Sequence, residues 1–253
     1  DRFAGRRGSY FSAYTSTMDG SGQIYSLYVP ETYDPTEAHA LELRPHSNLK
    51  FREPVEFTGA HIVAVCQGRG IEGLGELDAR EVLLDVSTHY NIDPDRVYLS
   101  GGSIGGGAVW RMLGRYPDLF AAARIDYGWT WGTSRLFLEN ASNVPISIYH
   151  AADDVWVPVE ESRAAVRFLA DLGSPVLYNE TSGGGHSQRQ KDPAWSTDDW
   201  LLAQRREPYP TQVHYATTTP LRGRSYWLDI REFSDPNKLV RVRARVGEDA
   251  TGT

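Results

Sequence analysis

The chain has 253 residues, of which 40% are hydrophobic and 23% charged, proportions that exclude a disordered or collagen-like protein. Its 26 Lys and Arg against 33 Asp and Glu give a net charge of −7, which argues against a nucleic-acid binder. The single cysteine excludes an internal disulfide and a cysteine-based metal site, and no apolar run approaches the ~20 residues of a membrane helix. The chain starts at Asp1 with no signal-like segment, so we expect a processed or trimmed chain, with secreted, periplasmic and cytoplasmic locations all open.

Strand and helix patterns alternate through most of the chain. Ala79, Leu83, Val86 and Tyr90, for example, recur at helical spacing and form one apolar stripe. The predicted strands are Gln23–Val29, His61–Cys66, Arg96–Ser100, Phe120–Ile125, Pro145–His150 and Pro175–Tyr178. The predicted helices are Glu76–Tyr90, Gly106–Tyr116, Val159–Leu172 and a last helix near Thr197–Arg206. Strands separated by helices of this length predict a mainly parallel sheet flanked by helices.

The pattern changes after Pro208. Three further strands are predicted with no helix between them: Gln212–Thr217, Ser225–Ile230 and Leu239–Val246. In the last of these, valine and alanine alternate with arginine, which is typical of a half-exposed strand. We therefore expect a main domain over residues 1–207, and over residues 208–253 a small β appendage or the start of a longer domain.

A Gly-x-Ser-x-Gly motif centred on Ser103 lies between a predicted strand and a predicted helix. This is the context of a nucleophile elbow, in which a tight turn exposes a serine hydroxyl beside the positive end of a helix. A plain glycine-rich turn or a phosphate-binding loop is the alternative. No lysine follows the glycines, and no Gly-x-Gly-x-x-Gly pattern opens the helix, so the nucleophile is the favoured interpretation.

A serine nucleophile needs a base and a carboxylate that orients the base. Asp154 follows the predicted strand Pro145–His150, and His186 lies in the glycine-rich loop after Pro175–Tyr178. Taken singly, Asp154 could cap a helix and His186 could be an ordinary loop residue. Together with Ser103 they follow the order Ser, Asp, His, each beyond the carboxyl end of a strand, where parallel sheets place their ligands.

Three stretches carry a resemblance to a known family. Residues 90–106, residues 115–122, and residues 149–154 with Val157-Pro158 resemble α/β-hydrolases of the prolyl-oligopeptidase-like and polyhydroxybutyrate-depolymerase or feruloyl-esterase-like branch. The resemblance covers about Gln23–Arg206. It implies an α/β-hydrolase fold and a serine esterase that needs no cofactor and no metal. By its register Asp154 is the triad acid, with Asp153 as the second choice.

One stretch departs from that family. Such enzymes carry His-Gly after a strand to supply half of the oxyanion hole, but this chain has no glycine between Gly22 and Gly59. The best counterpart is Leu41–Asn48, where Ser47 replaces the glycine and the strand pattern is weak. We expect the Ile104 N–H as one oxyanion donor, and Ser47, Asn48 or the loop of residues 67–70 as the second.

The departure keeps two other functions open beside the esterase. Losing one oxyanion donor typically costs ~10²–10³ in rate, so a weakly active hydrolase or a non-catalytic binding module is one alternative. A prolyl-oligopeptidase-like peptidase with the same triad is the other. Trp129, Trp131 and Trp156 are candidates for a wall around an acyl, aromatic or sugar group, against ordinary packing. The expected partner is a small-molecule or carbohydrate-linked ester, and the oligomeric state is open.

Overall fold

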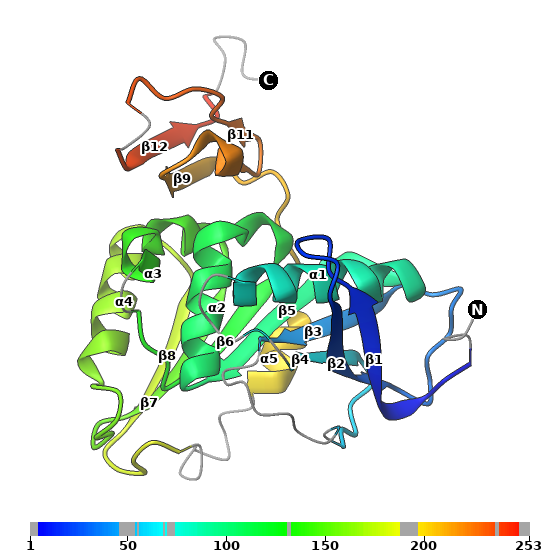
Figure 1. The fold of residues 1–253 in the computed structure, drawn as a ribbon. Helices are drawn as coiled ribbons and strands as arrows, with labels where there is room; N and C mark the ends of the chain where they lie inside the picture. Colours follow the sequence, from blue (N-terminus) through cyan, green and yellow to red (C-terminus); the bar gives the residue numbers. More distant parts are fainter. Residues whose placement is uncertain are drawn as a thin grey trace.

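A computed structural model describes residues 5–45, 54, 56–67, 69, 74–130, 133–187, 197–235 and 238–247. Its centre is an eight-stranded sheet in the order β1-β2-β4-β3-β5-β6-β7-β8 (Figure 1). The strands from β3 to β8 run parallel, and β1 and β2 join one edge of the sheet in antiparallel pairing. The predicted mainly parallel α/β architecture is therefore confirmed.

The strands of this sheet are β1 (Gly8–Thr15), β2 (Gly22–Val29), β3 (His39–Arg44), β4 (Ile62–Cys66), β5 (Ile92–Gly102), β6 (Ala122–Asp126), β7 (Ile146–Ala151) and β8 (Val176–Thr181). The α-helices are α1 (Leu74–His89), α2 (Ile104–Arg115), α3 (Thr133–Leu136), α4 (Glu160–Asp171) and α5 (Thr197–Ala203). Short 3-10 helices are η1 (Pro117–Leu119), η2 (Leu138–Asn143) and η3 (Pro220–Arg222).

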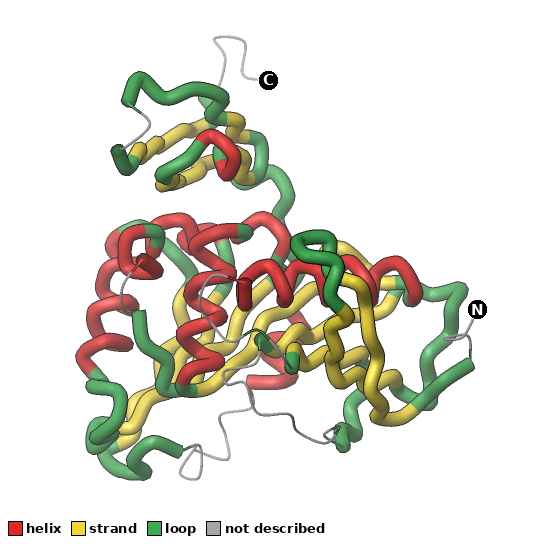
Figure 2. The backbone as a smooth tube through the Cα atoms, in the orientation of Figure 1, coloured by secondary structure: helices red, strands yellow, loops and turns green. Residues whose placement is uncertain are grey.

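Helices cover both faces of the sheet (Figure 2). On one face, the apolar stripes of α1, α2 and α4 join the strands in the main hydrophobic core. The stripe predicted for the first helix is buried, with Ala79 and Val86 fully enclosed. On the other face, Leu201 of α5 packs against Ala40 and Tyr98. This arrangement leaves the carboxyl ends of the parallel strands to carry the loops that hold Ser103, Asp154 and His186.

Two strands do not show the apolar pattern in the sequence, because polar residues occupy some of their buried positions. The inward positions of β1, which the sequence did not predict, are Tyr10, Ser12 and Tyr14, and polar hydroxyls obscure the alternation. The weak strand expected near Leu41 is in fact β3, which lies between β4 and β5 inside the sheet. Its middle residue, Glu42, is only 2% exposed, and a buried charge hides the strand from an apolar reading.

The Glu42 carboxylate lies within an ionic network. It accepts hydrogen bonds from Arg44 Nε at 2.9 Å, His61 Nε2 at 3.1 Å and Arg124 Nη2 at 3.2 Å, and from the Ser100 hydroxyl. Burial alone would raise the pKa of Glu42, but the hydrogen bond from His61 and the two guanidiniums outweigh it and hold the pKa well below its usual value. The charges therefore stabilise the buried carboxylate in its anionic form.

This network predicts acid sensitivity. A carboxylate whose pKa is lower in the folded state stabilises the fold above its unfolded pKa, and the contribution is lost as the pH falls toward the folded value. We expect Glu42→Gln to lower the unfolding free energy at pH 7 by about 3–5 kcal/mol. The difference from wild type should shrink between pH 5 and pH 3 in urea titrations. A difference independent of pH would contradict this account.

The C-terminal part forms a small separate sheet. β9 (Gln212–Thr217) pairs antiparallel with β12 (Val240–Arg245), on which arginines alternate outward as predicted. The predicted strand Ser225–Ile230 is wrong: the chain turns at Tyr226, whose φ is 53°, and makes the short hairpin of β10 (Arg224–Ser225) and β11 (Leu228–Asp229).

Several side chains join this sheet to the main body, among them Asn143 of η2, which donates to the carbonyl of Gln212 at 2.9 Å. Asn140 of η2 accepts from the N–H of Ala216 at 2.6 Å and donates to its carbonyl at 2.9 Å, as a neighbouring strand would. The pairing holds β9 beside η2 at the top of the view in Figure 1. Among the described residues, no helix combines the length and the apolar character that crossing a membrane requires.

Candidate active site

Ser103 stands at the turn between β5 and α2. Its backbone has φ 58° and ψ −124°, a conformation that is strained for a residue with a side chain. The Ser103 N–H donates to the carbonyl of Asp126 at 2.9 Å, which fixes the turn to the end of β6. The serine is only partly buried, so its hydroxyl is held at the sheet edge within reach of a ligand.

The glycines around Ser103 allow this turn to pack. A Cβ added at Gly101 would lie 2.5 Å from the carbonyl oxygen of Gly105, so the strand and the helix could not meet as closely. A Cβ at Gly106 would lie 2.8 Å from the Cα of Gly128, in the loop after β6. Real Cβ atoms do not approach backbone at such distances, so these positions require glycine.

The structure brings the three sequence-predicted residues together. The Nε2 atom of His186 lies 2.6 Å from the Ser103 Oγ, and its Nδ1 lies 2.7 Å from Oδ2 of Asp154. Because a carboxylate can only accept, Nδ1 carries the proton and Nε2 is free to accept from the serine hydroxyl. The ring of Tyr127 packs edge-on against the imidazole, with centroids 4.7 Å apart, and limits its rotation.

Asp154 is held on both oxygens. Oδ1 accepts from the backbone N–H groups of Trp156 at 2.8 Å and Val157 at 3.0 Å, while Oδ2 faces His186. Burial acts to raise the pKa of Asp154, but the hydrogen bonds from Val157, His186 and Trp156 outweigh it and lower the pKa below its ordinary value. The carboxylate is therefore anionic at neutral pH and aimed at the imidazole.

Asp153 contacts the backbone of the histidine loop and not the histidine ring. Its Oδ1 accepts from the backbone N–H of Gly185 at 2.7 Å, one residue before His186. Asp153 thus fastens the loop that carries the histidine, and Asp154 contacts the histidine ring itself. The geometry favours Asp154 over Asp153 for the acid.

Two solved structures superpose on the fold of this chain. A thermostable esterase superposes with a TM-score of 0.63 at 24% identity, over 78% of this chain and 63% of the esterase chain. The acylaminoacyl peptidase of Pyrococcus horikoshii superposes with a TM-score of 0.61 at 13% identity, over 75% of this chain and 39% of the peptidase. The chain has the α/β-hydrolase fold. At these identities the structural likeness concerns the fold alone.

Two curated relatives of this chain are named as plant carboxylesterases. The Arabidopsis thaliana carboxylesterase SOBER1 is 29% identical over 113 residues, 44% of this chain and 50% of the plant protein. A probable carboxylesterase, SOBER1-like, from the same plant is 29% identical over 122 residues, 47% of this chain and 46% of its own. The matched segment thus spans about half the length of these relatives. No protein-family model matches the chain.

The residues expected to donate to the oxyanion fall only partly within the described part of the chain. Ile104 directly follows Ser103 and is the first residue of α2. Its N–H therefore has no acceptor within the helix. The carbonyl of Pro45, just after β3, packs against Gly105, where a Cβ would lie 3.3 Å from it. Ser47, predicted as the second donor, lies outside the described residues, as do Asn48 and, in the alternative loop of residues 67–70, Gly68 and Gly70.

The three tryptophans differ in their surroundings. Trp129 is half-buried, and its ring packs on α2 where a Cβ at Gly107 would lie 3.2 Å from it. Trp156 is 75% exposed beside the acid, so its ring is available to a ligand. Trp131 lies outside the described residues. Of the tryptophans predicted to line a substrate pocket, Trp129 is thus packed against α2 and Trp156 is exposed.

His150 is the residue that sequence reasoning missed. It looked like an ordinary strand end, but it is fully buried and its Nε2 lies 3.2 Å from Oδ2 of Asp154. Its signal in the sequence was its place in residues 149–154, a stretch that carries the family resemblance, four residues before the acid.

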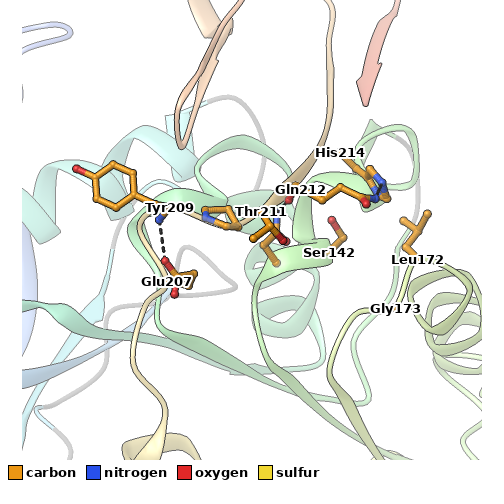
Figure 3. A pocket seen from close by; sticks show the side chains of 10 residues that line it. Ser142, Leu172, Gly173, Glu207, Tyr209, Thr211, Gln212 and His214 are labelled. Carbon is orange, nitrogen blue, oxygen red and sulfur yellow. Dashed lines mark hydrogen bonds between the residues drawn. The ribbon is translucent and has the colours of Figure 1, made fainter. Parts of the chain in front are cut away.

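A cavity of about 430 Å³ lies elsewhere in the fold (Figure 3). Asn143, which lines it, precedes β7, and Gly173 precedes β8, whereas Asp154 and His186 follow the ends of these strands. The cavity is therefore at the opposite end of the sheet from Ser103, next to β9. It does not belong to the candidate active site.

Proposed function

We propose that this protein hydrolyses carboxylic esters through a serine acyl-enzyme. The observation that carries the proposal is the continuous hydrogen-bonded chain from the Ser103 hydroxyl through His186 to the buried Asp154 carboxylate. Such a chain converts an unreactive hydroxyl into a nucleophile. The carboxylesterase names of the plant relatives support an ester as the substrate.

In the proposed reaction, the Ser103 Oγ attacks the ester carbonyl carbon while Nε2 of His186 takes the hydroxyl proton. Asp154 stabilises the resulting imidazolium through Nδ1–H, and the Ile104 N–H donates to the oxyanion. The imidazolium then returns the proton to the alcohol oxygen as the ester C–O bond breaks. Water, deprotonated by His186, then attacks the acyl carbon. The bond from that carbon to Ser103 Oγ breaks, the acid is released, and the His186 imidazolium returns the proton to Oγ.

The proposal includes an organisation and a substrate class. Residues 1–207 would form the catalytic unit and residues 208–253 a small β appendage, bound through Asn140 to Ala216. The substrate would be a small-molecule or carbohydrate-linked ester, for which the exposed Trp156 offers a flat apolar ring beside the acid loop. Peptide cleavage by the same triad is the competing outcome of the test below.

A panel of substrates tests this function. The intact chain is assayed on nitrophenyl esters of increasing acyl length, on acetylated and feruloylated sugars, and on peptide amides. We expect slow turnover confined to activated or small-acyl esters, because the glycine of the usual oxyanion loop is missing. Fast cleavage of unactivated esters would show that the oxyanion hole is complete. Preferred cleavage of amides would favour the peptidase, and no turnover at all would favour a binding module.

A further inference from the structure

His150 shares the Asp154 carboxylate with His186. It stands near the end of β7, 0% exposed, and both of its ring nitrogens have partners. Nε2 lies 3.2 Å from Oδ2 of Asp154 and 3.0 Å from the carbonyl oxygen of Val157. Nδ1 lies 2.7 Å from the hydroxyl of Ser162 on α4. A fully buried imidazole with all its hydrogen bonds made has one fixed orientation.

The partners also decide which nitrogen of His150 carries the proton. The Val157 carbonyl and the Asp154 carboxylate can only accept, so Nε2 must be the donor. The remaining lone pair on Nδ1 then accepts from the Ser162 hydroxyl. Burial lowers the pKa of His150 more than the contacts with Val157 and Asp154 raise it, so the ring is neutral near pH 7. His150 is thus a neutral donor to the acid and adds no second positive charge.

We propose that His150 is a positioning residue for the Ser103 reaction. Its Nε2–H fixes Oδ2 of Asp154 in the plane that meets His186 and takes a share of the negative charge on that oxygen. In this way it sets how tightly Asp154 holds the protonated form of His186. The inference rests on the proposed function, because it assumes that His186 is the base.

The direction of the effect follows from the charge on Oδ2. With two donors, His186 and His150, the negative charge is divided between them. Without His150, more of it faces Nδ1–H of His186, so the imidazolium is stabilised and His186 releases its proton at a higher pH. An enzyme lacking this donor therefore has less free base at neutral pH.

Other titratable groups surround the hydrogen bonds that link Ser103, His186 and Asp154. Tyr127 packs against His186, with Asp126 beside it, and Asp153 holds the loop through Gly185. Glu180 on β8 is the register partner of His150. Hydrogen bonds from Arg163 and Tyr178 lower the pKa of Glu180 to about 2, so it keeps its charge throughout the range in which histidine titrates.

The test is a side-chain NMR titration of the full-length chain. His186→Gln assigns the His186 signal, His150→Phe fills the space without a donor, and His150→Gln restores an N–H near the position of Nε2. We expect the titration midpoint of His186 to rise by roughly half a pH unit or more in His150→Phe, and to return most of the way in His150→Gln. Equal midpoints in wild type and both folded variants would overturn the proposal.

A measurement on the wild type covers the case in which His150→Phe does not fold. The ¹⁵N shifts of His150 report its tautomer directly. We expect a neutral ring protonated on Nε2 from pH 6 to pH 9. A ring protonated on Nδ1, or a cationic ring across this range, would overturn the proposal by itself, because neither is a neutral Nε2–H donor to the acid.

Kinetics separate this inference from the proposed function. In His150→Phe the acidic limb of kcat/KM should move to higher pH and kcat at pH 7 should fall about threefold with little change in KM, as a midpoint shift of about half a pH unit implies. His150→Gln should recover most of the loss, which general destabilisation would not explain. If the NMR midpoint shifts but no Ser103-dependent ester cleavage exists, the esterase proposal fails while the contact between His150 and Asp154 keeps its role.

Discussion

Ser103→Ala is expected to abolish ester hydrolysis by the intact chain. Alanine removes the only atom that would bond to the acyl group, while His186, Asp154 and the Ile104 N–H remain in place. The rate of activated ester cleavage should fall by on the order of 10³ or more, to the residual level given by binding and oxyanion donors alone. The measurement is the initial rate on a small-acyl nitrophenyl ester.

A matched control comes from the histidine loop. Ser182 is exposed, lies four residues before His186 and takes no part in the proposed reaction, so Ser182→Ala should keep the wild-type rate. Near-UV circular dichroism of both variants checks that the fold is retained. If Ser103→Ala folds and still cleaves the ester at a wild-type rate, the nucleophile has been misassigned.

The second large effect separates two adjacent carboxylates. Asp154→Asn places an amide against Nδ1 of His186 and favours the tautomer with the proton on Nε2, which no longer accepts from Ser103. We expect kcat to fall by about 10³–10⁴-fold, as for other triads that lose their acid. Asp153→Asn should have little effect, because an amide oxygen can still accept from the Gly185 N–H.

Stopped assays on the same ester at pH 7 and pH 9 measure this pair of variants. A severe loss in Asp153→Asn with a mild one in Asp154→Asn would move the acid by one residue. Such a result would mean that the His186 loop rearranges when a substrate binds, because the 2.7 Å contact to Asp154 would then not be the productive one.

The sequence predicted the architecture and the meeting of three side chains because both follow from strong local rules. Alternating apolar strands and helices predict a parallel sheet, and parallel strands deliver the residues after them to one edge. Ser103, Asp154 and His186 can therefore be related from the sequence alone. Short motifs at strand ends were sufficient for that.

What the sequence did not predict involves polar residues in buried places. β3 was expected to be weak because Glu42 interrupts its apolar run, and two partners that are distant in sequence, His61 and Arg124, help to hold the buried carboxylate. β1 was missed because Tyr10 and Tyr14 carry hydroxyls on its inward face. A lone His150 at a strand end likewise has no local mark of its contact with Asp154. Pairings between distant segments cannot be read from local periodicity.

Covalent labelling tests the central claim, that Ser103 is a nucleophile activated by His186 and Asp154, most directly. The intact chain is incubated with a fluorophosphonate, and the adduct is located by peptide mass spectrometry. We predict a single adduct on Ser103, absent in Ser103→Ala and formed much more slowly in His186→Gln. An unlabelled Ser103 under conditions that label a reference serine hydrolase, or labelling of Ser103 at the same rate without His186, would contradict the account.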